Sequence, residues 1–384
     1  MVKLASTNQC CGCHACASVC PRGAIAMERD REGFLYPVVK EDSCIGCLRC
    51  EKVCPILSEK KGRAEELPKA YAMWNKNEAV RKESTSGGVF TAIAEWVLVR
   101  GGVVFGAALD GACAVRHIAV EKKEELSLLR GSKYLQSTIG DAYRQARDYL
   151  AAGRIVLFSG TPCQIGGLRA YLGREYENLI CQDVVCHGVP SSAVWERVVG
   201  EYERESGKTV SSVAFRSKVT GWKKYSLVFT HTDGSVNTHL SGEDLFMKGF
   251  LRDLYLRPSC YRCAFKGYRR EADLTLADFW GIEHILPEID DDGGTSLVLA
   301  HTARGEALLL SVDGAVERRE IDVTEAARYN PSMLYASKNE KGRAVFWHDF
   351  NRLSLRRAIG RHTKPSFVKR CKRAVRRVLS LILK

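Results

Sequence analysis

The sequence contains no apolar run that could cross a membrane and no stretch of low complexity. A membrane-spanning helix needs about 18 consecutive apolar residues, and no segment of the 384 residues approaches that length. The segment Met1–Gln9 lacks the apolar core of a signal peptide. Hydrophobic residues make up 45% of the chain, which is enough for a sizeable core, so global disorder is excluded. We therefore expect a cytoplasmic protein of two or three domains.

Acidic residues are absent from the last part of the chain. No Asp or Glu follows Asp349, whereas 12 of the 58 Lys and Arg residues lie between Arg352 and Lys384. The rest of the chain carries 46 basic and 45 acidic residues, so it is nearly neutral. A nucleic-acid-binding protein would carry its basic residues as a patch on the folded body. We therefore expect no nucleic-acid partner.

Cysteine, by contrast, is abundant, with 16 residues in the chain. A reducing cytoplasm disfavours structural disulfides, which indicates metal or redox chemistry. A repeated run resembles that of a bacterial two-cluster ferredoxin: Cys10-x2-Cys13-x2-Cys16-x3-Cys20-Pro21, then Cys44-x2-Cys47-x2-Cys50-x3-Cys54-Pro55. Zinc is the alternative, but it usually takes two separated CxxC pairs.

In such ferredoxins the fourth thiolate of each 4Fe–4S cluster comes from the other repeat. The resemblance therefore implies two ligand sets: Cys10, Cys13, Cys16 and Cys54 for one cluster, and Cys44, Cys47, Cys50 and Cys20 for the other. Cys11 falls outside the spacing, and we expect it to be a bystander. Two clusters conduct single electrons, so the rest of the chain should hold what those electrons reach.

Composition divides the chain into a cysteine-rich domain (1–58), a charged linker (59–68), a body (69–350) and a basic tail (351–384). In the body, strand-like runs at 101–109 and 154–158 alternate with helical stretches at about 139–152 and 164–172, which is typical of an α/β domain. Segments 210–216 and 225–232 predict further strands in an insertion.

The tail predicts an amphipathic helix over 366–384, just after Pro365. Apolar residues from Phe367 to Ile382 and basic residues from Lys369 to Lys384 fall on opposite faces of a helical wheel. This pattern favours binding to an anionic membrane surface, which would place the protein peripherally on the inner face of a membrane. A helix docked on the protein's own body is the alternative.

Short motifs in the body carry residues suited to cofactor binding. Ser84-Thr85-Ser86-Gly87-Gly88 precedes a helical run, so its N–H groups could receive a pyrophosphate; a plain capped helix is the alternative. In Gly131–Ser137, Lys133 offers a cation, or is an ordinary solvated lysine. Cys163 opens a helix, where we expect a lowered pKa suited to a metal ligand or nucleophile; a buried structural cysteine is the alternative.

Five motifs in order resemble the coenzyme F420 hydrogenase/dehydrogenase beta-subunit family: STSGG, GSKYLQS, VLFSGTPCQIGGL, VCHGVPS and CYRCAFKGYRREADLTLADFWGI. The resemblance covers about residues 8–285 and implies an iron–sulfur flavoprotein that carries FAD. The sequence has no GxGxxG after a strand and no P-loop motif, so the flavin site would be of another kind. The expected fold class is α+β or α/β: a small bacterial-type ferredoxin domain, a mixed α/β flavin-binding domain and a C-terminal amphipathic helix.

The residues that this resemblance assigns to FAD come from four of the motifs. They are Ser84, Ser86, Gly87, Gly88, Lys133, Tyr134, Ser137, Gly160, Thr161, Pro162, Gln164 and His187. Asp278-Phe279-Trp280-Gly281 closes the match, and either positions a ring or a proton donor, or merely ends a strand with a packed Trp. No catalytic acid or base is assigned.

Cysteine arithmetic supports a third 4Fe–4S cluster. Outside the ferredoxin repeat, four cysteines lie in the family motifs: Cys163, Cys186, Cys260 and Cys263. Four thiolates are what a cubane needs. The competing interpretation is a redox-active dithiol at Cys260 and Cys263 with a free, nucleophilic Cys163. Other cysteines without a motif are expected to be core or surface thiols: Cys113, Cys181 and Cys371, of which Cys181 is also an alternative ligand.

The sequence thus predicts an oxidoreductase that passes electrons between ferredoxin-type clusters and FAD, and from there to or from a hydride-exchanging substrate such as a deazaflavin. Its partner would be a redox protein or a small redox substrate. An electron-transfer subunit without a substrate of its own is the first alternative. A non-redox iron–sulfur scaffold that has lost its flavin is the second.

Overall fold

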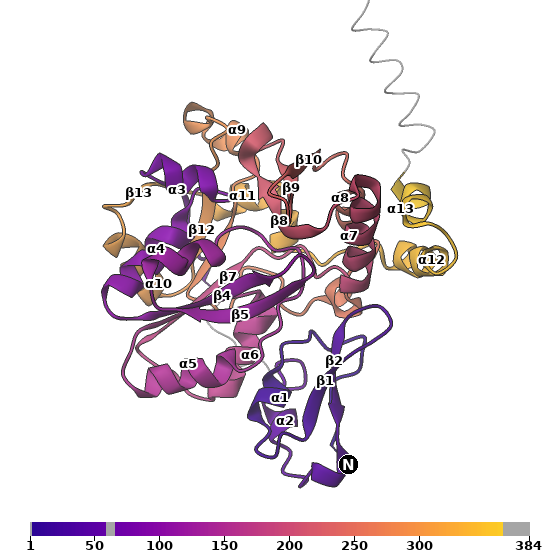
Figure 1. The fold of residues 1–384 in the computed structure, drawn as a ribbon. Helices are drawn as coiled ribbons and strands as arrows, with labels where there is room; N and C mark the ends of the chain where they lie inside the picture. Colours follow the sequence, from indigo (N-terminus) through magenta and orange to yellow (C-terminus); the bar gives the residue numbers. More distant parts are fainter. Residues whose placement is uncertain (1, 59–65, 364–384) are drawn as a thin grey trace, which may run out of the picture.

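The computed structural model describes residues 2–58 and 66–363, which fold into a small N-terminal domain beside a larger body (Figure 1). The small domain contains short helices and one antiparallel hairpin: α1 (Ala15–Val19), β1 (Ile25–Arg29), β2 (Leu35–Val39), a 3-10 turn (Glu41–Ser43) and α2 (Arg49–Lys52). The expected ferredoxin-like domain followed by a mixed α/β body is confirmed.

The two cysteine repeats have the same backbone conformation. Gly12 and Gly46 both have φ of +66°, and the residues that precede α1 and α2, His14 and Leu48, have φ of +65° and +57°. Left-handed residues at matching positions curl each loop around an interior space. The sequence repeat is therefore also a structural repeat.

Within the described residues, eight strands form the main sheet of the body in the order β13-β3-β12-β11-β7-β6-β4-β5. Their bounds are β3 (Lys69–Asn75), β4 (Val103–Asp110), β5 (Ala114–Val120), β6 (Val156–Ser159), β7 (Leu179–Val184), β11 (Leu274–Asp278), β12 (Ser296–Ala300) and β13 (Val316–Ile321). The four strands β4, β6, β7 and β11 run parallel, and the flanking strands pair antiparallel. The strands expected at 101–109 and 154–158 are β4 and β6.

Helices cover both faces of this sheet, as a parallel sheet with two apolar faces requires. The helices of the body before the insertion are α3 (Glu78–Glu83), α4 (Val89–Val99), α5 (Ala142–Ala151) and α6 (Pro162–Leu172). The first three helices after β11 are α9 (Ile282–Ile285), α10 (Ala303–Ser311) and α11 (Val323–Tyr329). One core joins α4 and α10 to one face, and another joins α5 and α6 to the opposite face. The helices expected at 139–152 and 164–172 are α5 and α6.

An insertion between β7 and β11 builds a second lobe around its own aromatic core. It holds α7 (Ser192–Ser206), a three-stranded sheet of β8 (Val210–Ser217), β9 (Ser226–His231) and β10 (Val236–Leu240), and α8 (Leu245–Phe250). The strands expected at 210–216 and 225–232 are β8 and β9. The remaining 3-10 turns of the body are Lys123–Leu128, Lys218–Thr220, Pro258–Arg262, Pro287–Ile289 and Pro331–Met333.

The body continues past residue 350, where the sequence pattern predicts the start of the tail. After α12 (Glu340–Phe350), the helix α13 (Leu355–Thr363) packs on α12 and α8. Leu355, Ala358 and Ile359 have no exposed side-chain surface. Residues 351–363 therefore belong to the folded body, and the amphipathic helix expected over 366–384 lies outside the described residues.

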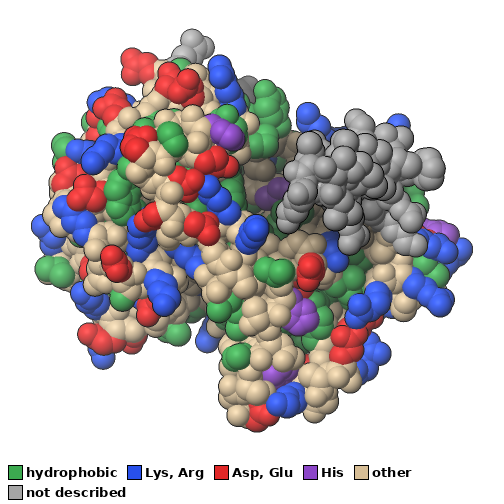
Figure 2. All heavy atoms as spheres, turned by 90° about the horizontal axis from the view of Figure 1, so that it is seen from above, with side chains coloured by type: hydrophobic (Ala, Val, Ile, Leu, Met, Phe, Trp, Pro, Cys, Tyr) green, Lys and Arg blue, Asp and Glu red, His purple; other side chains and the backbone are tan. Residues whose placement is uncertain are grey.

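Acidic and basic side chains are interspersed over the face of the body seen in Figure 2, without a broad patch of one sign. This distribution agrees with the nearly neutral composition of the chain before its tail. Across residues 2–58 and 66–363, no helix is both long and apolar enough to span a bilayer.

Candidate functional site

Two cavities in the small domain are each lined by four cysteines of the repeats. Cys10, Cys13, Cys16 and Cys54 line the first cavity. Cys20, Cys44, Cys47 and Cys50 line the second. These are the two crossed sets that the ferredoxin resemblance implies, and thiolates are the donors that iron–sulfur clusters require. The residues present therefore fit two cubanes, and the individual ligands stay predictions.

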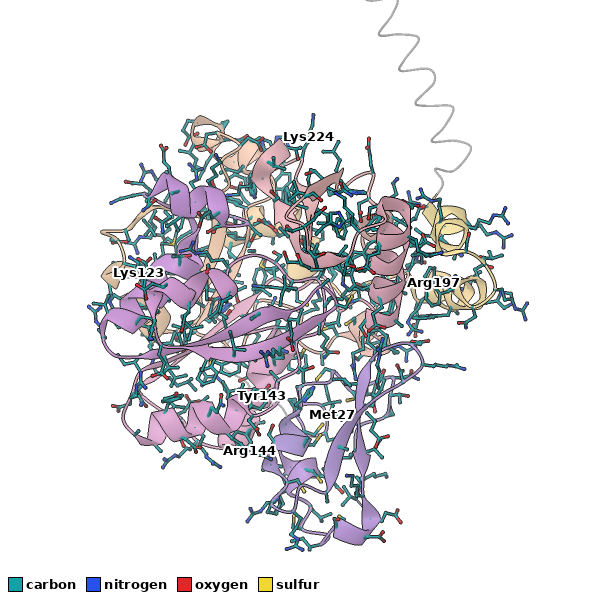
Figure 3. The ribbon with its side chains drawn as sticks, viewed as in Figure 1. Met27, Lys123, Tyr143, Arg144, Arg197 and Lys224 are labelled. Atoms are coloured by element: carbon teal, nitrogen blue, oxygen red, sulfur yellow. The ribbon has the colours of Figure 1, made fainter. Side chains whose placement is uncertain are left out.

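The first cavity lies against the body. Helix α6 packs on the small domain at Gly167, where the missing side chain leaves room for Cys13. A Cβ atom on Gly167 would lie 2.9 Å from Cβ and 3.1 Å from Sγ of Cys13. On the neighbouring helix α5, Arg144 donates a hydrogen bond of 3.2 Å to the carbonyl of Ser18. Figure 3 shows Tyr143 and Arg144 at this junction. The small domain is thus docked closely enough for its first cluster to face the body.

Cys11, which is expected to be a bystander, lies at this junction between Cys13 and Cys163. Its thiol is hydrogen-bonded to both Cys13 and Cys163, and its side chain is buried. Cys163 and Gly167 stand one helical turn apart on α6, so they share the face that meets the small domain. Cys11 thus lies between a cysteine of the first cavity and Cys163 of the body.

The four motif cysteines of the body lie together. Charge interactions link Cys163, Cys186, Cys260 and Cys263. Burial raises the pKa of Cys186 to about 12 and also raises that of Cys260. The expectation of a lowered pKa for Cys163 is wrong, since the hydrogen bond with Cys11 and burial raise the pKa of its thiol. The helix terminus does not offset these effects.

Of the other cysteines of the body, Cys181 shares a hydrophobic core with Cys163 and Cys263, so it stays an alternative ligand. Cys181 is fully buried on β7, in the core between the sheet and α5 and α6. Cys113 packs at the edge of the core of the insertion. Cys371 lies outside the described residues. Among the described His, Cys, Asp and Glu side chains, no three come close enough to hold a single metal ion.

A cavity of about 690 Å³ opens where the parallel strands end. Its lining includes Ser159, which ends β6, and Gly160 just after it, together with Cys186 and His187 after β7 and Trp280 after β11. Ligands of open α/β sheets bind at the carboxyl ends of the strands, and ligand pockets commonly measure about 300–1,000 Å³. This cavity is therefore the candidate site for a large organic cofactor, with Cys186 shared between it and the cysteine group.

Ten of the twelve residues that the sequence resemblance assigns to FAD line this cavity. They are Ser84, Ser86, Gly88, Lys133, Tyr134, Ser137, Gly160, Thr161, Gln164 and His187. Gly87 and Pro162 do not. The N–H of Gly87 donates to Ser296 Oγ at 2.9 Å, and a Cβ there would lie 2.3 Å from the carbonyl oxygen of Met73. Pro162 is the buried first residue of α6. Both residues serve the packing of the fold.

The STSGG segment is partly a capped helix and partly a cavity wall. Ser84 donates to the carbonyl of Val80 at 2.7 Å, and Ser86 donates to that of Thr295 at 2.8 Å, so neither hydroxyl is free. Gly88, with φ of +80°, is the N-cap of α4, and the first residues of this helix line the cavity. The free N–H groups at the start of α4 are what could receive a phosphate.

Lys133 is not an ordinary solvated lysine. Its Nζ donates to the carbonyls of Leu128 and Arg130, at 3.1 and 2.6 Å. Burial lowers the pKa of Lys133 to about 7. Two carbonyl oxygens thus hold this amine at the cavity wall, beside the start of α4.

Two polar residues that the sequence analysis did not single out also line the cavity. His117 Nε2 lies 2.9 Å from the carbonyl of Ser159 and His117 Nδ1 lies 2.6 Å from Ser137 Oγ; burial lowers its pKa to about 4, so the ring is neutral and Nδ1 accepts. Gln182 is 2% exposed, and its Oε1 atom has no partner. In the sequence, Gln182 can be noticed only as a polar side chain in the otherwise mostly apolar strand Leu179–Val184.

Aromatic rings and an ion pair close the far end of the cavity. Trp280 stacks on Trp222 with 5.4 Å between ring centroids, and the guanidinium of Arg216 lies 4.1 Å from the ring of Tyr225. Asp278 pairs with Arg216 and accepts a 3.2 Å hydrogen bond from Trp222 Nε1. Asp278 thus holds these side chains in place, as the interpretation of a packed strand end implies, while Trp280 still lines the cavity.

His187 lies beside a carboxylate at the cavity wall. Its Nε2 lies 2.7 Å from Asp253 Oδ1, and its ring meets Phe250 edge-on. Asp253 comes from the end of the α8 segment, 66 residues further along the chain. No local sequence pattern indicates this pairing.

Comparison with known proteins identifies both parts of the chain. Residues 9–56 match the family model of the 4Fe–4S dicluster domain, and residues 153–328 match that of the C terminus of the coenzyme F420 hydrogenase/dehydrogenase beta subunit. No curated protein sequence matches significantly. A similar solved structure is a chain of the F420-reducing NiFe hydrogenase complex from Methanosarcina barkeri, studied by xenon derivatization. It is 16% identical, the match covers 74% of this chain and 93% of that chain, and the TM-score is 0.48. The chain therefore joins a 4Fe–4S dicluster domain, at residues 9–56, to a region, residues 153–328, that matches the C-terminal family of the coenzyme F420 hydrogenase/dehydrogenase beta subunit.

Proposed function

We propose that the body binds FAD in the large cavity and a third 4Fe–4S cluster among its four motif cysteines. The chain would then pass electrons between the ferredoxin-type clusters and the flavin, and from there to or from a small hydride-exchanging substrate such as a deazaflavin. The observation that carries this proposal is the shared wall: Cys186 belongs both to the cavity and to the cysteine group that touches the docked ferredoxin domain.

The cavity offers what a flavin dinucleotide needs. The start of α4 and the amine of Lys133 suit a pyrophosphate. The unpartnered Oε1 of Gln182 suits an N–H donor of a flavin ring, since a buried carbonyl oxygen without a partner is costly. Tyr134, Phe250 and Trp280 supply flat apolar walls. The residues present thus fit FAD.

A bound flavin would supply the exchange between hydride and single electrons. The chain's own residues orient and enclose the ligand. The neutral ring of His117 fixes Ser137 and the end of β6, and Ser337 donates a hydrogen bond to the carbonyl of His187 in the segment after β7. The insertion lobe covers the side that carries Trp280 and Arg216, which would keep water from a bound ring.

Anaerobic purification with an iron count and flavin extraction tests the proposal. Three cubanes predict about 12 iron atoms per chain, together with FAD. Cys260→Ser should remove about four iron atoms and leave the ferredoxin signals unchanged. A flavin-free protein with about eight iron atoms would overturn both the FAD and the third-cluster assignments. Unchanged iron in Cys260→Ser would favour the redox-active dithiol.

An electron-transfer subunit without its own substrate is the second candidate, and one observation favours it. Ile45 and Leu48, which line the second cysteine cavity, are 63% and 44% exposed. Apolar side chains at the outer cluster suit docking of a redox partner protein. Turnover of a deazaflavin by the purified chain alone would exclude this candidate.

The tail adds a separate proposal about location. Residues 366–384 lie outside the described residues, and their alternation of basic and apolar residues remains the basis for binding to an anionic membrane surface. Because α13 is part of the body, the segment available for such binding starts after Thr363.

A further inference from the structure

We propose that Arg257 sets the reduction potential of the inner ferredoxin cluster, the one in the cavity lined by Cys10, and makes it the more easily reduced of the two. This proposal rests on the cysteine ligand sets given above, and it holds whether or not the body carries FAD or a third cluster. Arg257 belongs to the body, and it would act through its positive charge on a cluster of the ferredoxin domain.

Arg257 is fully buried at the junction of the two domains. Its Nε donates to the carbonyl of Cys10 at 2.7 Å, and its Nη2 donates to the carbonyl of Leu35 at 2.9 Å. Nη2 also lies 3.7 Å from Sγ of Cys10. The guanidinium of Arg257 is thus hydrogen-bonded to the backbone of Cys10, contacts the Cys10 sulfur, and is hydrogen-bonded to the β1–β2 hairpin of the small domain.

Gln136 fixes the other side of the guanidinium. Its Oε1 accepts a 2.9 Å hydrogen bond from Arg257 Nη1, while its Nε2 donates to the carbonyl of Cys11 at 2.9 Å. A Cβ atom on Gly12 would lie 2.7 Å from Gln136 and 2.8 Å from Arg257. The glycine of the first repeat therefore gives both side chains access to the cysteine loop.

No carboxylate of residues 2–58 or 66–363 forms an ion pair with Arg257. The hydrogen-bond partners of Arg257 among the described residues are the carbonyl oxygens of Cys10 and Leu35, the amide oxygen of Gln136 and the sulfur of Cys10. The ring of Tyr36, 4.2 Å away, offers only a weak counter-charge. A guanidinium stays protonated in proteins, and an unpaired buried charge is strongly unfavourable. A cluster ligated by four thiolates is the anion that this arrangement lacks.

A fixed positive charge at this distance favours the reduced form of a cluster, because reduction adds a negative charge. Net charge, hydrogen bonds to sulfur and solvent exposure are the terms that set such potentials. The second cavity is lined by Arg22 and Arg49, and both are exposed, so water and salt screen their charges. Electrons that arrive at the outer cluster would therefore move towards the body.

An anaerobic redox titration followed by electron paramagnetic resonance tests this inference on the purified full-length protein. Arg257→Gln keeps N–H donors without the charge, Arg257→Lys keeps the charge without the fork, and Arg49→Gln is the control at the outer cavity. At a fixed potential, Arg257→Gln should lower the ratio of reduced to oxidised inner cluster at least tenfold, which is about 59 mV for a one-electron couple. Arg257→Lys should stay within about threefold of the wild-type ratio.

Three results of the titration would overturn the role of Arg257. Unchanged ratios in Arg257→Gln with full iron content would overturn the inference, and so would an equal shift of both ferredoxin clusters. A shift in Arg49→Gln as large as that in Arg257→Gln would also overturn it, because the effect would then not depend on burial. If Arg257→Gln loses its iron, Arg257→Lys decides alone: a ratio near that of the wild type supports the role of the charge, and a tenfold loss refutes it.

Discussion

Gly167 tests whether the ferredoxin domain is docked as closely as the structure shows. A Cβ atom at this position would lie 2.9 Å from Cβ of Cys13, whereas carbon atoms in contact normally lie about 3.5–4.0 Å apart. Gly167→Ala must therefore move the Cys13 loop or α6 by roughly 0.6–1.1 Å. Overpacking of this kind costs about 1–3 kcal/mol.

Two matched glycines separate the effects of the added methyl group. Gly200, inside α7, has no atom within 4 Å of its would-be Cβ, so Gly200→Ala should stabilise by about 1 kcal/mol through helix propensity alone. Gly166 lies next to Gly167 in α6, and a Cβ atom on Gly166 would lie 2.8 Å from the ring of Phe265, a residue of the body. Gly166→Ala therefore overpacks α6 without touching the small domain. Because all three changes carry the same propensity gain, Gly167→Ala should be about 1–3 kcal/mol less stable than Gly200→Ala.

The assay is anaerobic urea denaturation followed by circular dichroism, combined with alkylation of Cys11 measured by mass spectrometry. Cys11 is 8% exposed at the junction, so only Gly167→Ala should increase its alkylation under native conditions. If Gly167→Ala matches Gly200→Ala in stability and Cys11 remains protected, the close contact between Cys13 and α6 does not exist. The close approach of the first cluster to the body would then fail with it.

Three further predictions concern the cavity and the tail. Gln182→Leu removes the unpartnered oxygen and should weaken FAD binding about 2- to 10-fold without loss of iron; full flavin retention would place the N–H donor elsewhere. For Lys133, burial lowers the folded-state pKa to about 7 from the ordinary value of 10.5, so between these pH values the unfolded chain binds the extra proton and wild-type stability rises with pH. Relative to Lys133→Met, the free energy of unfolding of the wild type should therefore increase by up to about 1.4 kcal/mol per pH unit over that window, and parallel pH profiles would show that the amine is solvated. A chain that ends at Thr363 should lose co-sedimentation with anionic vesicles while the full-length protein keeps it at low salt; equal pelleting of the two proteins would reject membrane binding through the tail.

Local spacing in the sequence is sufficient to predict the parts of the site whose residues lie close together along the chain. The cysteine repeats specify their own loops, because Gly12 and Gly46 occupy matching left-handed positions. The crossed grouping of Cys20 and Cys54 also appears in the two cavities, since it follows from the pseudo-symmetry of the repeat. The α/β alternation around β4 and β6 is predictable for the same reason.

Contacts between distant segments are not predictable from spacing. Arg257 lies 247 residues from Cys10, and no local pattern distinguishes it from other arginines. Cys11 breaks the repeat, so the spacing says nothing about it. Its position beside Cys163 depends on how α6 packs against the small domain. The pattern around Gly87 indicates a phosphate cradle, but the missing side chain of this glycine makes room for the backbone of β3.

The predicted boundary at residue 350 differs from the structure because charge outweighs a weak apolar signal. Arginines dominate the sequence of α13, and its buried face consists of Leu355, Ala358 and Ile359, spaced as i, i+3 and i+4. Three apolar residues on one face are enough to dock the helix against α8 and α12. A pattern this short becomes informative only when the surface that receives it is known.

The burial of the first cysteine cavity at the domain junction implies an order of maturation. A growing chain emerges from its N-terminus, and domains fold as units in that order. The ferredoxin repeat is complete at Cys54, long before α6 and Arg257 have been synthesised. Once they dock, Cys13 and His14 are only 8% and 5% exposed. All four cysteines of the first cavity are thus synthesised before the part of the body that covers Cys13, an order that allows a cluster to be assembled in the small domain before the body has folded.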